Sequence, residues 1–355
     1  MGFVLGTWQL VYTVAAIPLG FLIDRIGIYR SLAIAATVVA TSGVLRSFAV
    51  NFETLVLSVA LFGIGGCMVS VGIPKAASTW FRGKDRSTAT GIYVTGGTVG
   101  GIVALSLTNR VVIPLVGGWR TAYLIYGIFS FAVGAFWLIF ARHSPGSADP
   151  KLVSSPKGNT LRDVREALSK NVILVVIIGI TSFLVGHGIQ QWLPTILQAT
   201  NGMTASQAGL AVSMVNVFMV GGSLLAPRLP YIVGSKKKAV SILLFIQGLS
   251  VLTISGISGP VLWLVLALRG LSAGFMPLLT LILMDLPEVG PARMGMIGGL
   301  YFAVGEIGGF GGPALMGWFK DFTGTFTLGL VVLAIICELM ILLAFFLKVD
   351  EKQNK

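Results

Sequence analysis

The sequence Gly20-Phe-Leu-Ile-Asp24-Arg25-Ile-Gly27-Ile-Tyr29-Arg30 places three charged residues between two long apolar stretches. A bilayer core of about 30 Å requires about 20 apolar residues per helix, and both flanking stretches reach that length. The pattern therefore predicts a short loop at a membrane surface, with a membrane-spanning helix on either side.

The composition of the whole chain supports this interpretation. Of its 355 residues 55% are hydrophobic and only 11% are charged, and the mean hydropathy is +0.90. Soluble proteins contain about 25% charged residues. The formal net charge is +12, but the basic residues lie between apolar runs, where topology signals are expected. We therefore expect an integral membrane protein in contact with the lipid bilayer, and no nucleic acid partner.

Eleven apolar runs are long enough to cross a bilayer, which predicts an all-α membrane protein built as a polytopic helical bundle. The runs are residues 3–22, 31–49, 54–79, 88–109, 120–141, 171–196, 206–227, 239–257, 261–284, 293–317 and 326–347. The fourth and tenth runs are rich in glycine, as expected where membrane helices pack closely.

Lysine and arginine are concentrated in one set of loops, which the positive-inside rule assigns to the cytoplasm. This set contains Arg25, Arg30, Arg82, Lys84, Arg86, segment 142–170, Arg228, Lys236–Lys238, Arg293 and the tail Lys348–Lys355; the other contains Arg46, Arg110, Arg120 and Lys320. The C-terminus is then cytoplasmic, in a multi-pass protein of the plasma or inner membrane. Eleven crossings would place Met1 outside, so we expect that a first helix is missing; a true eleven-span protein is the alternative.

Residues 142–170 form the only long polar segment and divide the chain into two parts. The segment begins with a linker rich in serine, proline and glycine, and ends with Leu161–Leu168, whose apolar residues recur at helical spacing. We expect a short amphipathic helix on the cytoplasmic membrane surface, or a solvated turn. The expected domains are residues 1–141 with five spans, the linker 142–170, and residues 171–355 with six spans and a short tail.

The stretch from Gly20 to Arg30 resembles the signature loop of the major facilitator superfamily, G-x-x-x-D-[RK]-x-G-x-[RK]-[RK]. Tyr29 stands where a second basic residue is usual. Further stretches resemble other parts of that family: Pro74–Gly91, Gly117–Arg120, Gln191–Pro194, Gly305–Pro313 and Asp321–Gly324. Gln191-Trp192-Leu193-Pro194 is similar to the seventh span of the anion- and cyanate-type branches. The second-half repeat of the loop, Gly222–Lys238, has no aspartate at the acidic place.

This resemblance implies twelve spans in two pseudo-symmetric halves of six, which alternate access to one central site. It also implies that Gly20, Asp24, Arg25, Gly27 and Arg30 form a gating loop at the cytoplasmic side. We expect Asp24 to pair with nearby basic groups and with the amino end of the helix that begins near Arg293.

Polar residues at membrane depth are costly and are candidates for a substrate site. By the family's arrangement, the runs carrying His187, Asn216, Arg269 and Glu306 border the central cavity. Arg269 offers a planar fork that suits a carboxylate or similar anion, but it could instead form a structural ion pair with Glu306.

The other candidates are less specific. Glu306 is either that ion-pair partner or a proton carrier. Gln190 and Gln191 differ by about 100° on a helix, so at most one of them faces the cavity fully. Glu338, on a peripheral run, is a weaker proton candidate.

The sequence therefore favours a monomeric secondary transporter of a small solute, either an organic or an inorganic anion, with a proton or counter-solute as a coupling partner. An exporter of amphipathic drugs or of other neutral or cationic solutes is the alternative. An intramembrane enzyme is remote, because only His143 and His187 are present, and no catalytic pair or metal ligand set lies at depth. Cys67 and Cys337 lie in apolar runs and predict neither a disulfide nor a metal site. We expect no cofactor.

Overall fold

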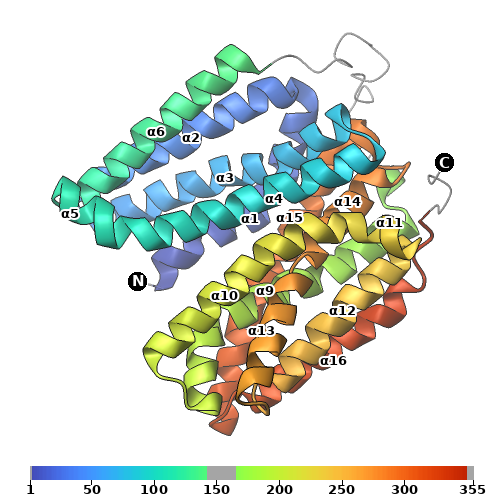
Figure 1. The fold of residues 1–355 in the computed structure, drawn as a ribbon. Coiled ribbons are helices and arrows are strands. Elements are labelled where there is room, and N and C mark those ends of the chain that lie inside the picture. Colours follow the sequence, from blue (N-terminus) through green and yellow to red (C-terminus); the bar gives the residue numbers. More distant parts are fainter. Residues whose placement is uncertain (1, 142–164, 350–355) are drawn as a thin grey trace. The chain divides into compact units, whose positions relative to one another are not determined.

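The computed structural model describes residues 2–141 and 165–349, and the described chain is helical without strands (Figure 1). Its helices are α1 (Gly2–Ile26), α2 (Ile28–Ser47), α3 (Phe52–Trp80), α4 (Gly83–Leu107), the π-helix η1 (Thr108–Val112), α5 (Ile113–Val116), α6 (Trp119–Phe140), α9 (Lys170–Asn201), α10 (Ala205–Leu225), the 3-10 helix η3 (Ala226–Arg228), α11 (Leu229–Val233), α12 (Lys236–Thr253), α13 (Pro260–Ser272), α14 (Phe275–Asp285), α15 (Gly290–Thr323) and α16 (Thr327–Ala344). The predicted all-α fold is confirmed.

Each of the eleven expected runs coincides with a long helix, except that the ninth is divided. Its two pieces, α13 and α14, are separated by Ala273 and Gly274. Within the described ranges, eight spans are long and apolar enough to cross a membrane: Thr7–Ile26, Ile28–Ser47, Phe52–Trp80, Trp119–Phe140, Lys170–Asn201, Ala205–Val233, Pro260–Asp285 and Thr327–Ala344. The remaining runs correspond to α4, α12 and α15, which are diluted by glycine or by the lysines that open α12. The number of crossings stays a prediction.

Local sequence explains where the helices begin. Asn51 and Thr54 form a reciprocal capping box at the start of α3, and Thr204 and Gln207 form another at α10. At the signature loop, Gly27 has φ 82°, a left-handed conformation that favours glycine. A single residue can therefore separate α1 from α2.

The described chain forms two compact units that do not follow the order of the sequence. Of the described residues, unit 1 contains 2–81, 100–141, 165–167 and 287–303, and unit 2 contains 82–99, 168–286 and 304–349. Helices α4 and α15 each belong to both units. The amino-terminal part of α4 packs within unit 2, and the amino-terminal part of α15 packs within unit 1.

Unit 1 is held together by close helix pairs, α1 with α3, α2 with α3 and α2 with α6. Gly127 on α6 shows how close the last pair is, because a Cβ there would lie 2.8 Å from the backbone nitrogen of Val44. Small residues at such crossings let membrane helices approach at backbone distance.

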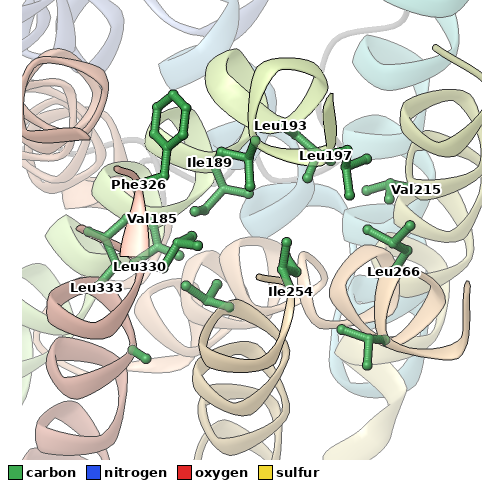
Figure 2. Close-up of a cluster of buried hydrophobic side chains, with 14 of the residues drawn as sticks. Val185, Ile189, Leu193, Leu197, Val215, Ile254, Leu266, Phe326, Leu330 and Leu333 are labelled. Carbon is green, nitrogen blue, oxygen red and sulfur yellow. The ribbon is translucent and has the colours of Figure 1, made fainter. Parts of the chain in front are cut away.

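Unit 2 has an apolar core centred on α9 (Figure 2). Val185, Ile189, Leu193 and Leu197 recur every four residues and therefore line one face of that helix. They meet side chains from the other helices of the unit, including Val215, Ile254, Leu266, Phe326, Leu330 and Leu333. This core fixes the rotation of α9 and so determines which polar residues of α9 lie off it.

The expected amphipathic helix lies mostly outside the described residues, as do the linker 142–164 and the last residues 350–355. Arg165, Glu166 and Ala167 at its end are helical. Glu166 Oε2 lies 3.6 Å from Arg293 Nη2 on α15.

Candidate functional site

Asp24, near the carboxyl end of α1, makes the most extensive polar contacts of any residue in the signature loop. It is 8% exposed, and its Oδ1 forms an ion pair with Lys75 Nζ on α3. The same oxygen accepts a hydrogen bond from the Gly295 N–H at 3.0 Å, and Oδ2 accepts one from the Met296 N–H at 2.8 Å. The loop carboxylate is therefore bound to a lysine and to the backbone near the amino end of α15, as expected.

Two glycines allow this contact. A Cβ at Gly20 would overlap the Gly295 carbonyl oxygen, and a Cβ at Gly295 would overlap Asp24 Oδ1. Gly20 belongs to the signature loop, so its role is to let the backbones of α1 and α15 approach each other. Arg25 and Arg30 are exposed and form no ion pair with any described residue.

Tyr29, the departure from the family pattern, has a partner of its own. Its hydroxyl donates to the Leu138 carbonyl at 2.5 Å, and Trp137 Nε1 donates to the Tyr29 carbonyl at 3.1 Å. The residue in the place of a basic side chain thus fastens the start of α2 to the end of α6.

Unit 2 contains a charged cluster around one aspartate that was not predicted from the sequence. Asp285, at the end of α14, accepts a hydrogen bond from Arg86 Nη1 at 2.6 Å and one from Lys236 Nζ at 2.7 Å. Arg86 Nη1 also donates to the Met284 carbonyl at 3.2 Å. The incomplete motif Gly222–Lys238 thus supplies a lysine to this cluster, while the acid comes from a different helix.

Three further contacts fasten the amino-terminal part of α4 within unit 2. Lys84 Nζ lies 5.7 Å from the ring centre of Tyr231, and Arg228 Nη2 donates to Thr88 Oγ1 at 3.1 Å. A Cβ at Gly91 would lie 3.0 Å from Leu224 Cα, so α4 and α10 also approach closely.

Among the predicted substrate-binding and proton-carrier candidates, two pairs come together in unit 2. Gln190 Nε2 donates to Asn216 Oδ1 at 2.9 Å and so links α9 to α10. His187 stacks on Phe183, and both His187 and the buried carboxylate of Glu306 lie against Gly309. Gln191 is exposed, whereas Gln190 is half-buried.

Arg269 lies elsewhere in unit 2, in the last turn of α13 and only 5% exposed. Its Nη2 is 3.4 Å from the Val185 carbonyl, its Nε is buried without an acceptor, and it lies within electrostatic range of the Cys337 thiol. Within the described part of the chain it pairs with no carboxylate, so the ion pair with Glu306 that the sequence left open is not formed. Both Val185 and Cys337 belong to the apolar core.

Glu338 also lies apart from the residues on α9, α10 and α15. A Cβ at Gly248 of α12 would lie 3.2 Å from its carboxyl carbon, so this side chain packs between α12 and α16.

The family model of the Major Facilitator Superfamily matches residues 1–313. The chain belongs to the Major Facilitator Superfamily. The members of this superfamily are multi-pass integral membrane transporters and not enzymes.

The individual similarities within the superfamily are distant. The hexuronate transporter of Escherichia coli K12 is 28% identical over 142 residues, which are 40% of this chain but only 32% of that relative. An uncharacterized transporter of Bacillus subtilis, YybO, is 23% identical over an alignment that covers 100% of this chain and 86% of YybO.

Among solved structures, the fucose:proton symporter FucP of E. coli superposes with a TM-score of 0.79. The superposition covers 98% of this chain and 91% of FucP at 15% identity, and shows a shared fold.

Proposed function

We propose that this superfamily member is a secondary transporter that moves a small organic anion by alternating access. The observation that carries the proposal is the Asp24 cluster, in which one carboxylate binds Lys75 and two backbone N–H groups of α15. Asp24 binds the amino-terminal part of α15, which lies in unit 1, and the same helix continues into unit 2. Such a bond can hold one conformation and release it when broken.

Asp285 is the counterpart of Asp24 in this proposal. It binds Arg86 on α4, and α4 begins in unit 2 and continues into unit 1. Each shared helix therefore has its amino-terminal part fastened by one buried or half-buried carboxylate. We refer to the Asp24 and Asp285 clusters as the two latches.

The anionic nature of the solute is supported by two observations. The hexuronate transporter, whose name specifies an anionic sugar acid, is among the relatives. Arg269 is a buried guanidinium that lacks a carboxylate partner among the described residues, so its charge is available to compensate an anion.

Uptake by the purified full chain in proteoliposomes tests the proposal. The substrate panel contains labelled glucuronate and galacturonate, neutral fucose, and a lipophilic cation. We expect saturable uptake of at least one anion that excess unlabelled anion inhibits, and little uptake of the others. Transport of the lipophilic cation or of fucose alone would replace the anion proposal with the drug-exporter or neutral-solute alternative.

A further inference from the structure

Two arginines of unit 1 lie at the end of α2 that is farthest from the signature loop, and neither has an acidic partner among the described residues. Helix α2 runs for 20 residues, roughly 30 Å, from Ile28 beside the loop to Ser47. Arg46 lies in its last turn, and Arg120 lies at the start of α6.

Arg46 is held by rings instead of by hydrogen bonds. Its Cζ lies 5.1 Å from the centre of the Phe62 ring and 5.4 Å from that of Tyr123. Its Nε is buried without an acceptor, and the guanidinium makes no hydrogen bond or ion pair with any described residue. The cation–π contacts fix its position, while its N–H donors form no hydrogen bond within the described part of the chain.

Arg120 belongs to the same aromatic group. Its Cζ lies 4.3 Å from the Trp119 ring centre, and the Trp119 ring meets Tyr123 edge-on at 6.1 Å. Its Nη2 donates to the Ala49 carbonyl at 3.0 Å, three residues beyond Arg46. The Trp119–Tyr123 pair therefore positions both guanidinium groups in one corner between the ends of α2 and α6.

No described acidic residue balances the positive charge of this corner. Glu53, in the first turn of neighbouring α3, is exposed and pairs with neither arginine in the described chain. The corner carries two positive charges, and a half-buried group with unused donors is unfavourable. An oxyanion would relieve both effects, because the planar donor fork of arginine matches phosphate oxygens in pairs.

The surroundings indicate where such an oxyanion comes from. Exposed apolar side chains surround the corner and are each more than half exposed: Phe48, Val50, Phe52 and Leu115. Aromatic and basic residues beside exposed apolar ones are typical of the level where lipid headgroups meet acyl chains. A soluble anion would need no such apolar border.

We propose that Arg46 and Arg120 bind the phosphate group of an anionic phospholipid at the membrane surface opposite the signature loop. The site lies between α2, α3 and α6 of unit 1 and is separate from every residue assigned above to solute binding or to the latches. The lipid would bridge the end of α2 and the start of α6 through the two arginines.

The test measures thermal unfolding of the purified, delipidated full chain in detergent as phosphatidylglycerol or phosphatidylcholine is added. We expect phosphatidylglycerol to raise the melting temperature of the wild type much more than phosphatidylcholine. In Arg46→Gln and Arg120→Gln the apparent lipid affinity should fall about tenfold each, and the double variant should lose the selective shift. Arg46→Lys keeps the charge but loses the fork, and should also bind more weakly.

Lys320→Gln is the matched control, because Lys320 is another cation on aromatic rings, 4.8 Å from the centre of Phe326, but in unit 2. It should keep the full phosphatidylglycerol shift. A shift that survives in the double variant, or one that Lys320→Gln also abolishes, would overturn the proposal.

A separate arm adds inorganic phosphate without lipid. An arginine-dependent shift with inorganic phosphate as large as that with phosphatidylglycerol would assign the corner to a soluble anion and overturn the lipid source.

Discussion

Asp24 and Arg269 are both buried charged residues, but their surroundings differ. Asp24 has a lysine and two backbone donors, so its charge is compensated on all sides. Arg269 has one long contact to a carbonyl and lies among apolar side chains. Substitutions at the two positions should therefore change stability in opposite directions.

Asp24→Asn leaves the buried Lys75 ammonium without its counter-charge, which should destabilise the protein by about 3–5 kcal/mol and reduce transport at least about tenfold. Asp24→Asn combined with Lys75→Met should recover most of the stability but not the transport. Detergent melting and proteoliposome uptake measure the two effects. Asp85→Asn, an exposed acid at the start of α4, is the control and should change neither. Normal transport in the double variant would reduce Asp24 to a structural residue.

Arg269→Met removes a lone charge from an apolar core and should leave stability unchanged or raise it by about 1–3 kcal/mol. Anion transport should nevertheless fall sharply in both Arg269→Met and Arg269→Lys, since neither retains the planar fork. Melting and uptake of the same preparations give the comparison, with Glu306→Gln added to each variant as a double-mutant cycle. Coupling above about 0.5 kcal/mol between Arg269 and Glu306 would contradict the separation seen in the structure.

At the scale of helices, we expect that the two charges of the Arg86–Asp285 salt bridge can be exchanged. Asp285→Arg or Arg86→Asp alone places like charges together, and should open the cytoplasmic end and lower transport. The swap Arg86→Asp with Asp285→Arg should restore part of both. Cysteine-labelling accessibility and uptake measure these changes, and Lys238→Gln, exposed in the first turn of α12, serves as the control. Failure of the swap to improve on either single variant would contradict a role for the Arg86–Asp285 pair in holding this end closed.

The contact between α1 and α15 depends on glycine. Two glycine-to-alanine substitutions on α15, one at the contact and one away from it, test this. Gly295→Ala would insert a methyl group against Asp24 Oδ1 and the Gly20 carbonyl, and should destabilise the protein by about 1–3 kcal/mol. Gly311→Ala on the same helix meets no atom within 4 Å, so it should be neutral or slightly stabilising. Melting of both variants checks this. Equal effects would mean that α15 does not approach α1 as closely as described.

For the molecule as a whole, the distribution of lysine and arginine predicts which ends face the cytoplasm. Reporter fusions after Lys238 and Lys355 should both report a cytoplasmic location, because the positive-inside bias is strong. A fusion after Val50, between α2 and α3, should report the opposite side. An external signal from either lysine site would reverse the orientation and place the latches on the outside.

The long helices could be predicted from sequence because bilayer thickness sets the length of an apolar run, and helix caps and glycines set its ends. The Asp24 contact to α15 could be predicted because its motif is local and specific. Asp285 could not be predicted as the partner of Arg86, because the two residues are 199 positions apart and no motif links them. Arg269 and Glu306 showed a related limit. Sequence gives the depth of a residue along a helix, but the direction in which it points depends on packing, which here turns Arg269 toward Val185 and Cys337.

The break between α13 and α14 at Ala273 and Gly274 influences which mutations this protein tolerates. A helix that stops carries a partial negative charge at its carboxyl end, and Arg269 lies in that last turn of α13. A cation in that turn is favoured by this partial charge. Closing the interruption would remove that favourable contribution and make the buried guanidinium more costly. Losing the arginine alone would leave the helix end intact, because the Gly270 and Leu271 carbonyls accept hydrogen bonds from the Ala273 and Gly274 N–H groups. We therefore expect a variant that closes the interruption to tolerate Arg269 less well than the wild type does.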